Sequence, residues 1–167
     1  EIATETINTF ENIYEEKWIN MMRDKLGLFG QDTNDQILIM ELLTWMHENK
    51  VDYTNTFCFL MNEKLSKHKI YNDKRFLIWK EKWKNRLKLN NNSQEKYLKL
   101  MRSVNPLVIP RNHKVEESLK AANNGDMKLM NYLLKVLEKP YTSQNDISKF
   151  QIPKEHSGEK YQTFCGT

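Results

Sequence analysis

The sequence predicts an all-α protein, an irregular bundle of about seven helices followed by an extended C-terminal tail. Apolar residues recur at helical spacings of three and four along most of the 167 residues. Glycine and proline are scarce, with five and four residues, and they fall between the periodic segments. Runs of β-branched residues, which favour strands, are rare. We expect residues 1–150 to form one helical domain and residues 151–167 to form the tail.

The first helix is predicted to begin at Thr4 or Thr6, either of which can cap it, and to end near Leu26. One face carries its apolar side chains, which are Ile7, Phe10, Tyr14, Trp18, Met21 and Met22. Another face carries Glu11, Glu15 and Glu16. No Glu-x-x-His motif accompanies these glutamates, so we interpret them as solvated and not as metal ligands.

Residues 34–48 predict a second helix that is apolar around most of its circumference. Such a helix should be buried on several sides, at the centre of the fold or against another domain. Asp52 is a suitable cap for a third helix, whose apolar residues are Phe57, Leu60, Met61 and Leu65. We interpret Cys58, inside this helix, as a small core residue.

The next predicted helix, over residues 72–88, is strongly basic. Residues 64–102 hold 13 basic and 3 acidic side chains, whereas residues 1–63 hold 4 basic and 12 acidic ones. Its apolar residues, Phe76, Trp79, Trp83 and Leu87, form one core-facing stripe. The tryptophans are therefore unavailable as platforms for stacking bases. The basic face either docks against acidic neighbours in the same chain or binds an acidic partner.

The remaining pattern predicts a helix after the Asn90–Ser93 loop, then an extended strap containing Pro106 and Pro110, then a helical hairpin. The hairpin begins at Asn112 and ends before Pro140. Gly125 should close its first helix in a left-handed conformation, and Asp126 should cap its second. A short turn is expected near Ser143–Phe150.

The spacing of chemically reactive residues indicates no active site. There is no glycine-rich phosphate loop, no HExxH, no CxxC and no nucleophile elbow. His113 with Glu116 and Glu117 is weak evidence for a metal site. No apolar run is long enough to span a membrane, and no targeting segment is visible. We therefore predict no catalytic, cofactor-binding or metal residue and no membrane partner.

Cys165 is the exception, because it lies two residues from the end on a segment without a helical pattern. A thiol in such a place suits a redox or disulfide-forming role. The alternative is an incidental free cysteine. Pairing with Cys58 stays open, although a core position would make Cys58 a poor partner.

Several short motifs occur in a fixed order along the chain. The most specific lie between Met101 and Asp126: Met-Arg-Ser-Val-Asn-Pro, then Arg111-Asn112, Ala121-Ala122 and Gly125-Asp126, followed by Pro140-Tyr141. The others are Lys25–Leu28, Asp52–Thr54 with Phe57, and Phe164–Thr167. Together they resemble the C-terminal region of the selenoprotein O family of pseudokinases, and the resemblance covers essentially the whole chain.

This resemblance implies a C-terminal extension of a protein-kinase-like fold, whose lobes would precede residue 1. Those lobes would bind ATP and Mg²⁺ and transfer AMP to Ser, Thr or Tyr hydroxyls of proteins. The only functional residue carried over is Cys165, as a redox cysteine able to form a disulfide with the kinase-like domain. Two departures are Gly166-Thr167, where the family commonly has two serines, and Cys58, where an arginine is expected.

The chain is thus expected to be the non-catalytic C-terminal part of a protein adenylyltransferase, binding neither ATP nor Mg²⁺ itself. Its partners would be the kinase-like domain of the same chain and protein substrates. The location would be mitochondrial in a eukaryote and cytoplasmic in a bacterium. The alternative is a non-enzymatic helical interaction module whose basic helix 72–88 binds an acidic partner or RNA. Because the tryptophans face inward, we do not expect nucleic acid.

Overall fold

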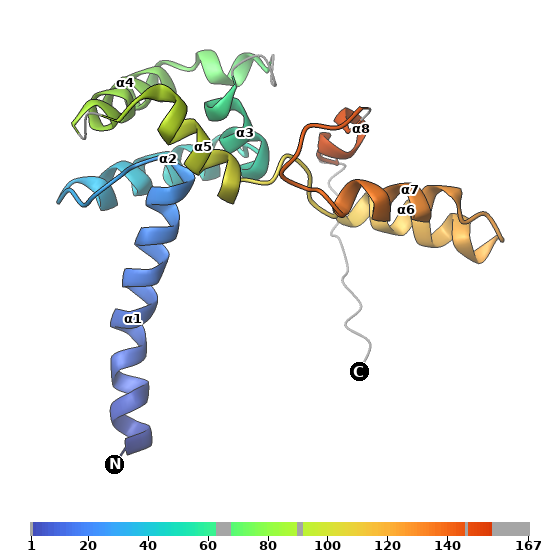
Figure 1. The fold of residues 1–167 in the computed structure, drawn as a ribbon, viewed down its shortest axis with the longest axis horizontal. Coiled ribbons are helices and arrows are strands. Elements are labelled where there is room, and N and C mark those ends of the chain that lie inside the picture. Colours follow the sequence, from blue (N-terminus) through green and yellow to red (C-terminus); the bar gives the residue numbers. More distant parts are fainter. Residues whose placement is uncertain (1, 63–67, 90–91, 146, 155–167) are drawn as a thin grey trace.

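A computed structural model of the protein describes residues 2–62, 68–89, 92–145 and 147–154 (Figure 1). Within these ranges every regular element is a helix and no strand occurs. The α-helices are α1 (Ile2–Lys25), α2 (Asp35–Glu48), α3 (Tyr53–Met61), α4 (Lys74–Lys88), α5 (Gln94–Val104), α6 (Asn112–Asn123), α7 (Lys128–Leu137) and α8 (Ser148–Gln151). A 3-10 helix, η2 (Lys69–Asn72), precedes α4. The all-α prediction is confirmed for this part of the chain.

Polar side chains cap three of the α-helices. The carboxylate of Asp52 accepts a hydrogen bond from the backbone N–H of Asn55 at the start of α3, as predicted. Ser93 caps α5 in the same way. Asp73 caps α4, so the basic helix begins at Lys74, two residues later than its sequence pattern suggests. The backbone before this cap forms η2 instead.

Two glycines close helices in the left-handed conformation. Gly27 follows α1 with φ of 70°, and Gly125 follows α6 with φ of 85°. Both positions agree with the predicted helix ends, since a glycine pays no Cβ penalty at positive φ.

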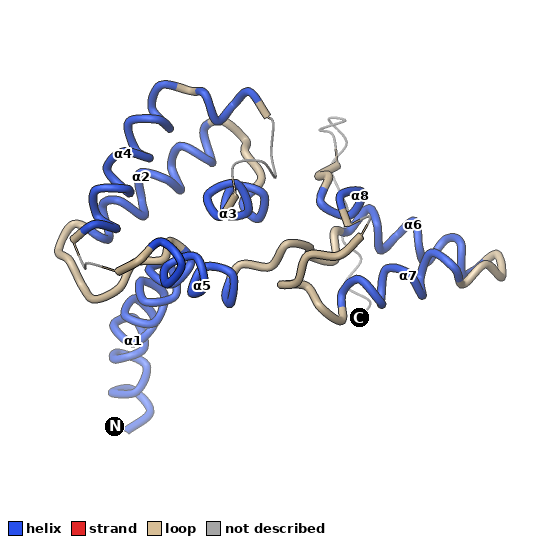
Figure 2. Tube along the Cα trace, turned by 45° about the horizontal axis from the view of Figure 1, so that its top comes forward, coloured by secondary structure: helices blue, strands red, loops and turns tan. Residues whose placement is uncertain are grey.

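Side chains of α1–α5 and η2 make up the larger hydrophobic core, and Figure 2 shows how these helices are arranged. The apolar stripe of α4 is buried as predicted, and the indole N–H groups of Trp79 and Trp83 each donate to a backbone carbonyl at 2.8 Å. The sequence predicts that α2 is buried on several sides, but in this structure it is buried on one side only. Ile39 and Leu42 are fully buried, whereas Ile37 and Met40 are exposed.

Helices α6 and α7 form the predicted antiparallel hairpin, which extends away from α1–α5 (Figures 1 and 2). Its base packs into a smaller core, made up of Val108, Leu133, Val136, Ile147 and Phe150. The proline-bearing strap of residues 105–110 joins the two parts, and its side chains at Asn105 and Val108 are buried.

Some predictions concern residues that the structure does not describe, namely Leu65 and most of the tail, including Cys165. The domain division at residue 150, the extended tail and the kinase-like context therefore stay predictions. Over the described ranges, no helix has both the length and the apolar character needed to cross a membrane.

Candidate functional site

The N-terminal part of α1 projects from the packed helices (Figure 1), and it carries an exposed apolar face. Ile7, Phe10 and Tyr14 are 71%, 65% and 58% exposed. Their spacing of three and four places them on one side of the helix, and the rings of Phe10 and Tyr14 stack with centroids 6.1 Å apart. By contrast, Met22 near the C-terminal end of α1 and Leu26 just beyond it are buried in the core. The predicted amphipathic helix is present, but the core uses only its C-terminal end.

This face continues across α2 to α4 through two adjoining grooves. The first, of about 660 Å³, lies between α1 and α2 and is lined by Tyr14, Trp18 and Met40, among others. The second, of about 730 Å³, lies between α2 and α4 and adds Ile37 and Ile78. Met40 lines both grooves, so they form one surface. We name it the α1–α2–α4 apolar face, comprising Ile7, Phe10, Tyr14, Trp18, Ile37, Met40 and Ile78.

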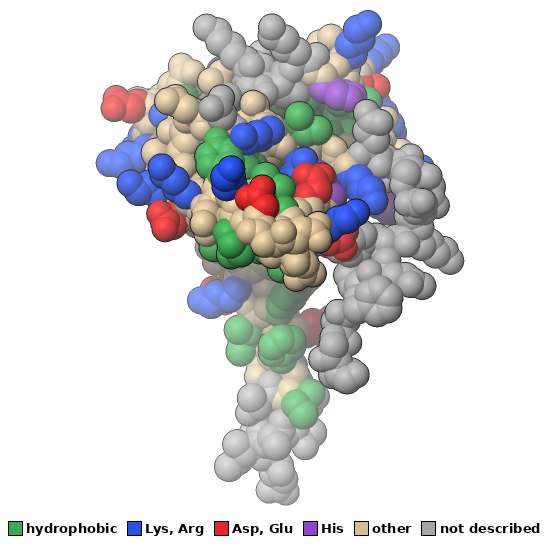
Figure 3. Space-filling view, turned by 90° about the vertical axis from the view of Figure 1, so that its right-hand side faces the viewer, with side chains coloured by type: hydrophobic (Ala, Val, Ile, Leu, Met, Phe, Trp, Pro, Cys, Tyr) green, Lys and Arg blue, Asp and Glu red, His purple; other side chains and the backbone are tan. Residues whose placement is uncertain are grey.

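An apolar surface of this kind is typical of an interaction site. Its side chains come from three helices. Those of α1 lie on the part of the helix that projects from the rest of the structure, where hydrophobic side chains are visible in the lower part of Figure 3. Contiguous apolar patches are costly to leave in water and usually mark sites of contact with another protein surface. The chemistry of this face therefore suits docking.

Ion pairs between α2 and α4 form the polar walls of the second groove. Glu48 pairs with Arg75 and Glu41 with Lys82, each at 2.6 Å, as the two helices run antiparallel. Both pairs are exposed, so each contributes little stability. They show that the basic helix docks against acidic residues of its own chain, which was one of the two interpretations.

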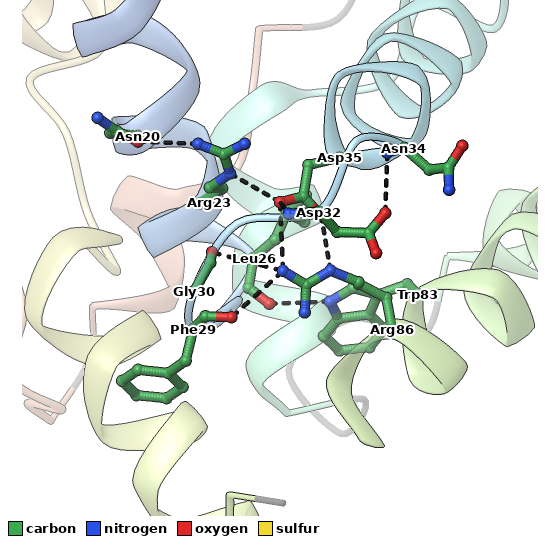
Figure 4. A network of polar contacts seen from close by, with 10 residues as sticks. All are labelled: Asn20, Arg23, Leu26, Phe29, Gly30, Asp32, Asn34, Asp35, Trp83 and Arg86. Carbon is green, nitrogen blue, oxygen red and sulfur yellow. Dashed lines mark hydrogen bonds and ion pairs between the residues drawn. The ribbon is translucent and has the colours of Figure 1, made fainter. Parts of the chain in front are cut away.

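A third pair across the same helices is buried (Figure 4). The carboxylate of Asp35 accepts hydrogen bonds from Arg86 at 2.7 and 3.2 Å and from Arg23 at 2.7 Å. Burial alone would raise the pKa of Asp35, but the hydrogen bonds from Arg86 and Arg23 outweigh it and the pKa is lowered. Sequence reasoning missed this network. Its only signal was an acidic residue in the first turn of a largely apolar helix.

The structure places Cys58 in the core, as predicted. Its side chain is buried, and its Sγ approaches the carbonyl oxygen of Pro106 at 3.6 Å. Burial, and secondarily the nearby charge of Asp52, raises the pKa of the thiol to about 11. A protonated, enclosed thiol is a poor disulfide partner. Cys165 lies outside the described residues, so its role stays a prediction.

The histidines do not assemble a metal centre within the described ranges, where no group of three His, Cys, Asp or Glu side chains could hold an ion. His113, the weak candidate, has its pKa lowered, first by burial and then by the charge of Lys114. Glu117 is paired with Lys114 at 2.8 Å.

Comparison with known proteins assigns a family. The model described as "Protein adenylyltransferase SelO" matches residues 2–138. Three curated relatives are each called protein nucleotidyltransferase YdiU. The protein of Pelagibacter ubique is 55% identical over 166 residues, which are 99% of this chain and 34% of the relative. That of Alcanivorax borkumensis is 44% identical over 100% of this chain and 35% of the relative. That of Clostridium perfringens (strain 13) is 43% identical over 99% of this chain and 34% of the relative. The chain thus spans about a third of the length of these bacterial relatives.

Proposed function

Since this chain belongs to the SelO family of protein adenylyltransferases, we propose that it forms the C-terminal helical part of a protein nucleotidyltransferase. The whole protein would transfer AMP from ATP to Ser, Thr or Tyr hydroxyls of other proteins. The names of the relatives support nucleotidyl transfer. In this proposal the chain contributes support and regulation, and the reaction takes place in the rest of the protein.

The α1–α2–α4 apolar face is the observation that carries the structural role. We propose that the kinase-like domain of the same polypeptide covers this face. About two thirds of the length of each relative lies outside the part that aligns with this chain, which is ample to cover a surface of this size. Burying Phe10, Tyr14 and Met40 against that domain would remove exposed apolar area from water and fix the two parts together.

ATP and Mg²⁺ belong to the kinase-like domain in this proposal. The described residues offer no set of carboxylates or histidines that fits a metal ion, so no step of the reaction is assigned to them. Their contribution is to hold the helical part in place.

Cys165 is proposed as a redox cysteine that forms a disulfide with the kinase-like domain. The support is the family resemblance at Phe164–Thr167, together with the burial of Cys58, which leaves that thiol unsuited to pairing. In the full-length protein, Cys165→Ala should make AMP transfer unresponsive to reductant while leaving thermal stability unchanged. An unaltered response to reductant would remove the switch role.

The proposed location is the cytoplasm of a bacterium. The mitochondrial expectation applied to a eukaryotic source, and the bacterial relatives argue against it.

A pair of substitutions tests docking and activity separately. In the full-length protein, Tyr14→Asp places a charge on the α1–α2–α4 apolar face, and Leu119→Asp places one on α6. The wild-type side chains are similarly exposed, at 58% and 50%, so neither change should disturb the helix that carries it. We expect Tyr14→Asp to lower both the melting temperature and the transfer of labelled AMP to protein, and Leu119→Asp to change neither.

The outcomes distinguish the two parts of the proposal. Absence of AMP transfer by the unmodified full-length protein would contradict the enzymatic assignment and leave docking open. Equal effects of the two substitutions on melting temperature would contradict docking at this face, whatever the activity.

A further inference from the structure

Two hydrophobic cores share little apolar contact in the described part of the chain. The larger is enclosed by α1–α5 and the smaller by α6–α8 with the strap. Leu107 packs against both, and it is the one residue that the two clusters have in common within the described ranges. Apolar burial between the two cores therefore contributes little to holding the hairpin against α1–α5.

Arg111, at the base of the hairpin, bridges the two cores. Its guanidinium meets the carboxylate of Asp52 in two hydrogen bonds, of 2.8 and 2.9 Å, and its Nε donates to the carbonyl oxygen of Phe150 at 3.2 Å. Asp52 caps α3, Arg111 occupies the N-cap position of α6, and Phe150 lies in α8. One side chain at the start of α6 thus contacts α3 in the larger core and α8 in the smaller one.

Further hydrogen bonds surround this contact. The amide of Asn55, in α3, donates to the carbonyl oxygen of Gln151 at 3.0 Å, and the amide of Gln151 donates to that of Leu107 at 2.8 Å. The junction is consequently polar and directional. A bidentate pair between arginine and carboxylate fixes orientation as well as distance, which apolar contact alone does not.

We infer that Arg111 is a positioning residue that couples two separately packed units, the α1–α5 core and the α6–α8 unit. The side chain of Arg111 is 9% exposed and that of Asp52 is 21% exposed. Solvent therefore screens this pair far less than it screens the exposed pairs on α4. Without the guanidinium, the α6–α8 unit should open and close independently while the larger core stays intact.

Hydrogen–deuterium exchange of the full-length protein tests this inference, because it reports each helix separately. Arg111→Ala should speed exchange in α6, α7 and α8 by on the order of 100-fold, as expected for removing one partner of a shielded pair. Exchange in α2 and α4 should not change. Arg111→Lys keeps the charge but cannot form the bidentate contact, so it should lie between the wild type and Arg111→Ala.

Arg75→Ala is the matched control, since it also removes an arginine paired with a carboxylate, but at an exposed site. It should leave exchange in α6–α8 unchanged. Two results would overturn the inference. Unchanged exchange in Arg111→Ala would show that the guanidinium does not couple the units. Faster exchange throughout the chain in Arg111→Lys, or failure of Arg111→Ala to fold, would show a single cooperative unit.

Discussion

The guanidinium of Arg86 and the carboxylate of Asp35, 51 residues apart in the sequence, meet in two hydrogen bonds within the protein interior. This contact holds the C-terminal half of α4 against the start of α2. Arg23, in α1, donates a hydrogen bond to the same carboxylate, so side chains from three helices meet at one buried charge. The arrangement fixes the relative positions of the helices that present the α1–α2–α4 apolar face.

Removing Arg86 should be costly. Arg86→Met leaves the buried carboxylate of Asp35 with Arg23 as its one remaining guanidinium partner, and we expect a loss of about 3 kcal/mol in the free energy of unfolding. Urea denaturation measures it. Arg75→Met, at the exposed pair with Glu48, should cost no more than about 1 kcal/mol. Equal losses would contradict a special role for the buried pair.

The pH dependence of stability should identify Asp35. Its pKa is lower in the folded protein than in the unfolded chain, because the hydrogen bonds from Arg86 and Arg23 outweigh the effect of burial. The carboxylate therefore stabilises the fold above its unfolded pKa of about 3.9. That contribution is lost as the pH falls through the lower folded value. Asp35→Asn should be less stable at neutral pH, and its stability should fall less steeply below about pH 4 in acid titrations of unfolding.

Two glycines of similar conformation should respond differently to alanine. At Gly27, an added Cβ would lie 3.0 Å from Cγ of Met101 and 3.1 Å from Cβ of Tyr97. At Gly125 it would meet nothing within 4 Å. Gly125→Ala should therefore cost about 1 kcal/mol for backbone strain alone, and Gly27→Ala about 1–3 kcal/mol more for overpacking. Thermal unfolding measures both, and similar losses would show that the close contact at Gly27 relaxes freely.

The thiol of Cys58 should resist alkylation in the native protein. Its burial and its pKa of about 11 keep it protonated and enclosed at pH 8. Iodoacetamide followed by peptide mass spectrometry should find Cys58 unmodified until the protein is denatured. Rapid alkylation of Cys58 in the native protein would show that its thiol is accessible, and Cys58 would again be a candidate disulfide partner.

Much of this fold is predictable from local signals. Asp52, Ser93, Gly27 and Gly125 mark helix ends because capping and positive φ act within a few residues. The inward stripe of α4 follows from spacing alone.

The sequence does not reveal which apolar face is covered, because a helical pattern is the same whether its partner is present or not. Phe10 and Met22 both fit the apolar face of α1, yet one is exposed and the other is buried. Nor does local pattern reveal long-range pairs. Asp35–Arg86 and Asp52–Arg111 join residues 51 and 59 apart, and only the tertiary fold brings them together.

The central claim, that the α1–α2–α4 apolar face is buried against the rest of the protein, can be measured with two methionines. Met40 lies on that face and Met127 lies at the tip of the hairpin, and within this chain the two residues are 48% and 49% exposed. Mild oxidation of the full-length protein, followed by peptide mass spectrometry, compares them in one sample. Docking predicts slow oxidation of Met40 and fast oxidation of Met127, whereas equal rates would contradict it.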